Sequence, residues 1–375
     1  MVVARQTDEW LSGLDREVLR GRGWRLRVVD LRRRGPNWAL WLREGLRSKM
    51  SRALFDCGLR TASLAVRSYV RGADELVALA LEEGGDCFIA HTQAALPVAA
   101  AAAERRGVSM GCDYEDLLPR MAGEPSRVVE LLEARYLEAC AYISVPSEEI
   151  ARHLTARYSV RPPVVLYNVF PVRLADGVRP PASRPSRRVL RLHWFGQTIG
   201  PGRGLEDAVQ AVGMLGDAVE LHLRGRVSRR YWNQLAALGQ RWNALGRILV
   251  HSPVEHDQLI RAVCEYDVGL ALERPEHEAY ARTVTNKLFG YLLAGLGIAA
   301  TDTPGHREVL QQIPEAGFLY RAGDAEALAA GLVRWVEDPR ALRRAQEASW
   351  DAARSRFCWD REKEKFLAVI RQLLC

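Results

Sequence analysis

Glycines and one arginine between residues 196 and 204 could bind a phosphate group. The run, Gly-Gln-Thr-Ile-Gly-Pro-Gly-Arg-Gly, follows the apolar segment 189–195, which predicts a strand, and precedes the segment 205–215, which predicts an amphipathic helix. Glycines let the backbone approach a phosphate, and Arg203 could form charge-assisted hydrogen bonds to it. In a doubly wound α/β domain such a turn lies at the carboxyl edge of the sheet, where ligands bind. The run therefore predicts an anion site.

A second phosphate candidate is a helix start near residue 285. Thr285 or Asn286 suits the N-cap, and apolar residues follow at helical spacing through 288–295. A helix N-terminus presents free N–H groups and the positive end of a dipole, which favours an anion. Lys287, one of four lysines among 53 basic residues, lies in the first turn. A cation there opposes the dipole unless an anion is close.

Polar residues also follow two predicted strands in the first half of the chain. His91 ends the segment 86–90, and a histidine there could bind a phosphate or a sugar hydroxyl, or could serve only the structure. Asp113, Glu115 and Asp116 follow the segment 108–112. These carboxylates suit recognition of sugar hydroxyls, or they are the acids that favour a helix N-terminus.

The elements that position these residues alternate as in an α/β protein. Two domains, 1–178 and 188–358, are separated by the proline-rich linker 176–187, and a last helix lies within 359–375. The chain begins Met1-Val2-Val3-Ala4 and enters a predicted helix, 8–20, almost directly, so either the first strand is a stub or the assigned start of the chain is late. We predict strands at 24–30, 86–90, 108–112, 141–145, 164–167, 189–195, 219–223, 248–251, 268–272, 298–300 and 317–320. We predict helices at 8–20, 74–83, 95–106, 126–140, 205–215, 230–238, 257–265 and 361–374, and further helices that begin at 285, 325 and 341. We predict a turn at 304–305.

Composition excludes several classes of protein. No apolar run approaches the length of a membrane span, and polar residues from Gln6 to Glu9 interrupt any signal peptide. Seven scattered cysteines without a CxxC pair are typical of reduced, mostly buried thiols, and we find no metal-ligand spacing. We therefore expect a cytoplasmic protein without a metal site.

The net charge of +7 is concentrated between residues 32 and 71. Ten basic residues stand there against two acids, and no nucleic-acid motif accompanies them, so we expect no nucleic-acid partner. Apolar residues of a predicted helix fall on one face: Trp38, Trp41, Leu42, Leu46, Met50 and Leu54. Such a helix can lie on an anionic membrane, at the inner surface, but we favour the alternative that its apolar face packs into the core.

Several of these motifs resemble a known family. The string Asn-Lys-Leu-Phe-x-Tyr-Leu-x-Ala-Gly-Leu from Asn286, followed by Asp-x-Pro-Gly from Asp302, resembles the donor segment of GT-B glycosyltransferases, and of glycosyltransferase family 4 especially. The turn 196–204 is similar to that family's Gly-Arg-x5-Lys-Gly loop. Arg203 takes the lysine position, and Gln197 replaces the arginine. The segment ending at His91 resembles the family's Asp-x4-His strand end.

The resemblance implies a fold and a set of site residues. The fold is two Rossmann-like doubly wound domains facing a central cleft, with the C-terminal helix crossing back to the first domain. Arg203, Glu278 and His91 are the implied catalytic residues, and Asp113 and Glu115 face the acceptor. The implied donor-binding residues are Gly196, Gln197, Gly202, Gly204, Arg224, Thr285, Asn286, Lys287 and Leu288.

Two glutamates of the family pattern are replaced. Arg282 stands at the position of the first, near the donor sugar, and Gly290 at that of the second, which binds ribose. Glu273, Glu276 and Glu278 precede them in a predicted exposed loop, and Glu278 is our substitute for the sugar contact. This departure leaves room for an altered or impaired enzyme.

The implied activity is transfer of a sugar from a nucleotide-diphosphate sugar to a hydroxyl of a small-molecule, glycan or lipid-linked acceptor, with retention of configuration and no cofactor. We favour a UDP-sugar. Domain closure about the linker near Pro180 would exclude water. Two alternatives remain: a catalytically impaired sugar-nucleotide binding partner, and a GT-B-like nucleotide-sugar epimerase.

Overall fold

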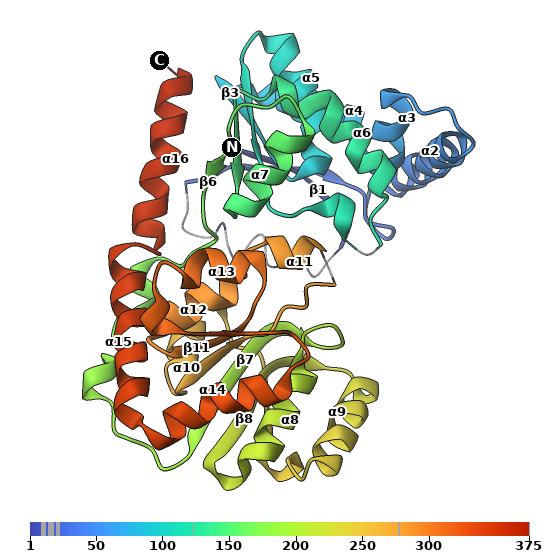
Figure 1. Ribbon diagram of the computed structural model, residues 1–375. Helices are drawn as coiled ribbons and strands as arrows, with labels where there is room; N and C mark the ends of the chain where they lie inside the picture. The colour runs from blue at the N-terminus through green and yellow to red at the C-terminus, as the bar shows by residue number, and fades with distance from the viewer. Residues whose placement is uncertain (9–12, 14–18, 20–22, 122, 277, 375) are drawn as a thin grey trace. The chain divides into compact units, whose positions relative to one another are not determined.

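The computed structural model describes residues 1–375 except 9–12, 14–18, 20–22, 122, 277 and 375 (Figure 1). The chain forms two compact units: Met1–Val145 with Ala151–Val164 and Val369–Cys375, and Pro146–Ile150 with Val165–Ala368. Residues 165–178, which the sequence placed in the first domain, group with the second unit. No helix of the described residues is long and apolar enough to cross a membrane.

The second unit contains a six-stranded parallel sheet of Rossmann order. Its strands are β7 (Leu190–Ile199), β8 (Val219–Val227), β9 (Ile248–His251), β10 (Val268–Ala271), β11 (Gly297–Thr301) and β12 (Gly317–Tyr320), arranged β12-β11-β10-β7-β8-β9. The first and fourth strands of the unit, β7 and β10, are therefore neighbours. The chain leaves them in opposite directions across the sheet, which makes this point the topological switch point where such domains bind ligands.

Helices cover both faces of this sheet (Figure 1). The helices of this unit are α8 (Leu205–Leu215), α9 (Arg229–Arg241), α10 (His256–Val263), α11 (Glu278–Arg282), α12 (Asn286–Ala294), α13 (Pro304–Leu310), α14 (Ala325–Glu337) and α15 (Pro339–Ser355). The last helix, α16 (Trp359–Leu374), passes from this unit into the first at Val369. Alternate strand residues enter two apolar cores: Leu270 packs with the residues of α8 and α14, and Ala271 with those of α10 and α12. This period of two is what a strand buried on both faces requires.

The first half of the chain contains two smaller sheets. Strands β1 (Val2–Gln6) and β2 (Leu26–Asp30) form a parallel pair. A four-stranded sheet contains, in sequence order, β3 (Cys87–His91), β4 (Ser109–Asp113), β5 (Tyr142–Val145) and β6 (Val164–Val165). The helices are α2 (Trp38–Asp56), α3 (Ala62–Tyr69), α4 (Ala73–Glu83), α5 (Leu96–Arg106), α6 (Ser126–Tyr136) and α7 (Glu148–Arg157). The chain thus begins with a five-residue strand, and the predicted helix 8–20 falls mostly outside the described residues.

Three local predictions were wrong. Strands β7 and β8 continue four residues beyond the predicted 195 and 223, because a register shift between Phe195 and Thr198 lets the ladder resume. The expected turn at 304–305 instead starts α13, whose first turn is capped by the hydroxyl of Thr303 accepting from the His306 N–H. The 126–140 helix ends at Tyr136 and continues as a 3-10 turn.

The apolar face of α2 is exposed, which contradicts the expectation that it packs into the core. Trp38, Leu42, Leu46, Met50 and Leu54 recur every four residues, and each is between 43% and 66% exposed. The buried residues of this helix, Glu44, Ser51 and Phe55, lie on another face. The helix therefore presents to solvent a stripe that a core-packed helix would bury.

Candidate functional site

The glycine-rich turn lies against the end of β10, at the switch point of the six-stranded sheet. Gly204 has a φ of +69°, and a Cβ built on it would stand 2.3 Å from the carbonyl oxygen of Leu272, the residue directly after β10. Only glycine fits both requirements, because a side chain would clash with backbone and the left-handed conformation would be strained. The close approach brings the loops after β7 and β10 together at the carboxyl edge.

Extension of β7 shortens the glycine-rich loop to residues 200–204. Gln197 is exposed within the strand, beside Gly196 at the register shift. The Arg203 guanidinium lies 5.4 Å from the centre of the Tyr280 ring, on α11, and the residue is half-buried. Gly202 also adopts a positive φ, +75°. The loop therefore brings a cation within cation–π distance of the helix that follows β10.

Helix α12 begins at the predicted residue but without the predicted side-chain cap. Thr285 is the N-cap residue, and its hydroxyl accepts a hydrogen bond from the Lys287 ammonium at 3.2 Å instead of capping the helix. Lys287 is buried, and its ammonium donates to Oε1 of Glu273 at 2.6 Å. The anion that offsets the unfavourable dipole position of Lys287 is thus a carboxylate of the protein.

Glu273 is the centre of a buried charged cluster that the sequence did not reveal. It was expected in an exposed loop, but it is 6% exposed, and its second oxygen lies 3.2 Å from Nε2 of His306. The ring Nδ1 of His306 lies 2.8 Å from the carbonyl oxygen of Thr301 and donates to it. Burial alone would raise the pKa of Glu273, but Lys287 and His306 together hold it below its usual range. The rarity of lysine was the only sequence signal for this cluster.

Glu278 and Arg224, two further predicted site residues, are both engaged by protein groups. Glu278, on α11, accepts from Arg282 Nε at 3.1 Å, and Arg282 also lies 3.5 Å from Glu149. Arg224 is in β8 rather than a loop, and it donates to the carbonyl oxygen of Ser252 at 2.9 Å. The structure therefore brings Glu278 to the helix that carries Tyr280, beside Arg203, and directs Arg224 toward the loop after β9.

Gly290, the position at which the resembled family pattern has a glutamate, faces aromatic rings. A Cβ on Gly290 would lie 3.1 Å from Phe195 and 3.3 Å from Phe170. A glutamate could enter this position only if those rings moved, and its carboxylate would then lie among apolar groups. The departure from the family pattern is thus built into the packing of the second unit.

In the first unit the fold brings His91, Asp113 and Glu115 together. Nδ1 of His91 lies 2.9 Å from Asp113 and Nε2 lies 3.4 Å from Glu115. One ligand atom of each lies within 4.8 Å of the others, so the three could hold a metal ion, although each imidazole nitrogen already faces a different carboxylate. The hydrogen bond with Asp113 raises the pKa of His91, and burial raises that of Glu115. The sequence spacing of these residues gave no sign of such a group.

Comparison with known proteins agrees with this architecture. Residues 216–368 match the glycosyl transferase-like family. The structure of HepE from Anabaena in complex with UDP is 17% identical, with a TM-score of 0.71 over 99% of this chain and 92% of HepE. Residues 216–368 are therefore glycosyl transferase-like, and the chain has the GT-B fold.

Two other solved structures are similar to the chain in fold. Sucrose-phosphate synthase from Thermosynechococcus elongatus is 18% identical, with a TM-score of 0.66 over 81% of this chain and 77% of the synthase. A glycosyltransferase from Rickettsia africae is 13% identical, with a TM-score of 0.66 over 99% of this chain and 98% of that protein. No protein with a curated description matches the chain in sequence. Membership of family 4 stays a prediction.

Proposed function

We propose that this protein transfers a sugar from a nucleotide-diphosphate sugar to an acceptor hydroxyl with retention of configuration. The observation that carries the proposal is the contact of Gly204 with Leu272, which brings the glycine-rich turn to the end of β10 at the switch point. A glycine-rich turn at that point is where Rossmann-type domains bind nucleotides. The presence of UDP and UDP-glucose in HepE structures supports a uridine nucleotide donor.

In this proposal the leaving diphosphate is stabilised by two groups of the second unit. Arg203 supplies a positive charge from the glycine-rich turn. The start of α12 supplies backbone N–H groups and its dipole, because the first residues of a helix have no intrahelical acceptor. The side chain of Lys287 is held by Glu273, so we assign it to orienting this helix start. No metal is needed to neutralise the diphosphate in this arrangement, and transfer in the presence of a chelator tests that part.

The test of donor binding is a thermal-shift screen with UDP, GDP, dTDP and ADP. We expect stabilisation by UDP, since a ligand that binds only the folded state raises the melting temperature. Stabilisation by none of the four would refute the proposal. Transfer from UDP-sugars is then measured with purified protein. Binding without transfer would point to a non-catalytic sugar-nucleotide binding protein, and proton exchange at the sugar without acceptor would point to an epimerase.

The test of the phosphate role is Arg203→Ala, with Arg241→Ala in α9 as the matched control. Removal of one charge-stabilising donor costs about 100-fold in turnover, so we expect a loss of this size with an unchanged melting temperature. Arg241 is exposed on a helix that does not carry the site, and its substitution is expected to leave turnover unchanged. Turnover of the Arg203 variant at the wild-type rate would remove this residue from the mechanism.

We also propose that α2 docks on an anionic membrane, where a lipid-linked acceptor would be reached. The exposed stripe of Trp38, Leu42, Leu46, Met50 and Leu54 supplies the apolar area. Exposed basic residues at and near this helix supply the charge that an anionic lipid surface complements: Arg33, Arg34, Lys49 and Arg60.

Vesicle sedimentation tests the membrane contact. Wild-type protein is expected to sediment with vesicles that contain phosphatidylserine and not with phosphatidylcholine vesicles. Leu46→Glu/Met50→Glu should abolish sedimentation, because two carboxylates would enter the apolar stripe. Leu367→Glu is the control, since Leu367 is an exposed apolar residue of α16. Equal binding by the double variant would exclude α2 as the contact.

A further inference from the structure

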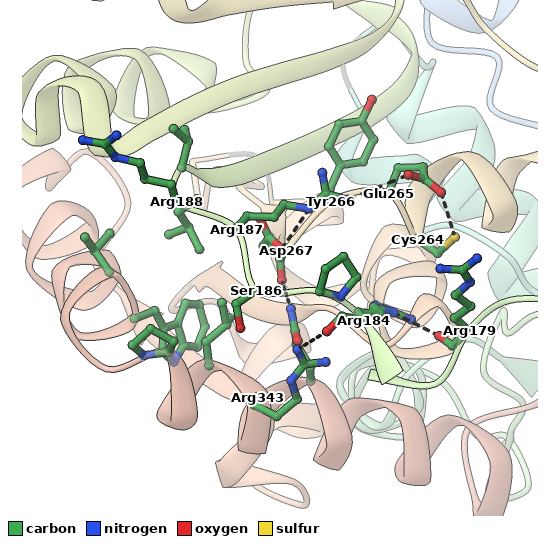
Figure 2. A pocket seen from close by; sticks show the side chains of 18 of the residues that line it. Arg179, Arg184, Ser186, Arg187, Arg188, Cys264, Glu265, Tyr266, Asp267 and Arg343 are labelled. Atoms are coloured by element: carbon green, nitrogen blue, oxygen red, sulfur yellow. Dashed lines mark hydrogen bonds and ion pairs between the residues drawn. The ribbon is translucent and has the colours of Figure 1, made fainter. Parts of the chain in front are cut away.

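Figure 2 shows a cavity of the second unit, and its volume is about 520 Å³. It lies at the edge of the six-stranded sheet opposite the glycine-rich turn. Its walls include Leu190 at the start of β7, Ala218 just before β8 and Asp267 just before β10. These are the amino ends of parallel strands, whereas the candidate donor site is built at their carboxyl ends. The cavity is thus separate from the site described above.

The lining of this cavity is strongly basic. Six arginines face two carboxylates, which leaves four positive charges in excess; the residues are Arg179, Arg184, Arg187, Arg188, Arg261 and Arg343 against Glu265 and Asp267. Burial raises the pKa of Asp267, which weakens one of the two counter-charges at low pH. Burial lowers the pKa of Arg184, and the charge of Arg343 lowers it further. Cations are gathered here at a cost that an anion would offset.

Some of these arginines are already used by the fold. Arg184 donates to the carbonyl oxygens of Ala294 at 2.6 Å and Gly295 at 2.9 Å, at the end of α12, and its Nε donates to Arg179 O at 3.0 Å. Its guanidinium therefore caps a helix C-terminus. Arg261 donates to the carbonyl oxygen of Asp176 at 3.1 Å. Neither is a free anion ligand.

Arg343 and Arg187 retain hydrogen-bonding capacity toward the cavity. Arg343 donates through Nη2 to Arg184 O at 2.8 Å, but its Nη1 is buried and has no hydrogen-bond partner among the described residues. Leaving a buried charged donor unpaired is costly, so a ligand acceptor would relieve it. Arg187 reaches its carboxylates only at long range, 3.9 Å to Asp267 and 3.8 Å to Glu265. Figure 2 shows Arg343 beside Arg184, and Arg187 beside Asp267.

We propose that this cavity binds a phosphorylated small molecule whose phosphate is held by Arg343 and Arg187. Guanidinium groups match phosphate oxygens in geometry and charge. A volume of 520 Å³ is that of a small-molecule site and exceeds the needs of a phosphate ion alone. Tyr266, Trp335 and Leu342 line the remainder and would contact the body of the ligand. The site is independent of the proposed transferase activity.

The experiment measures binding of glucose 6-phosphate by thermal shift and calorimetry, with glucose as the unphosphorylated control. We expect glucose 6-phosphate to stabilise the wild-type protein and glucose to have no effect. Arg187→Gln and Arg343→Met should each weaken binding at least tenfold. Arg187 makes only long contacts, so its variant tests the site even where Arg343→Met fails to fold.

The matched control is Arg344→Gln. Arg344 neighbours Arg343 on α15, is 66% exposed in its side chain and pairs with Asp338 at 3.5 Å outside the cavity. Its variant should bind glucose 6-phosphate as the wild type does. Stabilisation by UDP should be the same in all variants, which separates this site from the donor site. No response of the wild type to millimolar glucose 6-phosphate, or an equal response in the Arg187 and Arg344 variants, would overturn the proposal.

Discussion

The two units each gather a histidine and at least one carboxylate at the carboxyl ends of parallel strands, but one group is buried and the other is exposed. In the second unit the side chain of His306 is 0% exposed and that of Glu273 is 7% exposed, and Lys287 completes the cluster. In the first unit His91 is 64% exposed, between Asp113 at 39% and Glu115 at 45%. The same residue types therefore have different uses. Buried charges must pair with one another and hold the loops after β10 and β11, whereas an exposed histidine can exchange a proton with a substrate.

The largest effect is expected from Glu273→Gln. Loss of this carboxylate leaves the ammonium of Lys287 buried without a counter-charge, so we expect the free energy of unfolding to fall by about 3–5 kcal/mol. Urea unfolding at pH 7 measures it. Glu273→Gln/Lys287→Met removes both charges and should recover most of the loss. A loss below about 1 kcal/mol for the single variant would show that the cluster is solvated.

His91→Ala should have a large effect on activity and a small effect on stability, whereas Glu273→Gln is expected to act mainly on stability. We expect kcat/KM to fall about 100-fold if His91 transfers a proton or stabilises charge in the transition state. The free energy of unfolding should change by no more than about 0.5 kcal/mol, because the side chain is exposed. Steady-state kinetics and urea unfolding of the same preparation measure both. Unchanged kcat/KM would reduce His91 to a structural role.

A third histidine, His193 in β7, tests what burial does without a counter-charge. It is 0% exposed, neither ring nitrogen has a hydrogen-bond partner in the part of the chain that the structure describes, and its ring stacks 4.2 Å from that of Tyr266. Burial lowers its pKa well below the ordinary value of 6.5. His193→Phe keeps an aromatic ring and removes two unpaired nitrogens, so we expect about 1 kcal/mol of stabilisation at pH 7.

The same variant should change the pH dependence of stability. Below about pH 6.5 the unfolded wild-type chain binds a proton at His193 that the folded chain does not, so the free energy of unfolding falls as pH decreases. His193→Phe removes this loss, so the free energy of unfolding of the variant should depend less steeply on pH between pH 7 and pH 5. His222 and His251, whose pKa values burial also lowers, retain part of the slope. An unchanged slope would mean that His193 is protonated in the folded state.

The smallest expected effect is on the protonation of His91 itself. The hydrogen bond with Asp113 raises the pKa of His91, so Asp113→Asn should lower that pKa toward its ordinary value. The change in this pKa should be small, because both side chains are partly exposed. Titration of the ring proton by NMR measures it, with Asp116→Asn as the control for a nearby acid. Equal titration of wild type and Asp113→Asn would show that the contact is absent in solution.

Local patterns predicted most elements of the second unit but not their ends. The helix 205–215 and the strands 248–251 and 317–320 lie where the sequence predicts them. The extension of β7 could not be predicted, since Gly196 and Gln197 lack strand propensity and stand at the register shift, after which Thr198 and Ile199 pair with β8 again. The exposure of the α2 stripe was missed for a similar reason: amphipathicity shows which residues share a face, and not what covers that face.

The sequence by itself determined the α/β class, the glycine-rich turn and the resemblance to GT-B glycosyltransferases, because periodicity, turn chemistry and residue strings are local properties. Only the tertiary structure decided which charges meet. Glu273 and His306 are separated by 33 positions, and Arg187 and Arg343 by far more. Their proximity depends on strand order in the sheet, as does their burial. The effect of a charge on the stability of the folded chain depends on its neighbours and its exposure. The roles of these residues could therefore be assigned only from the folded structure.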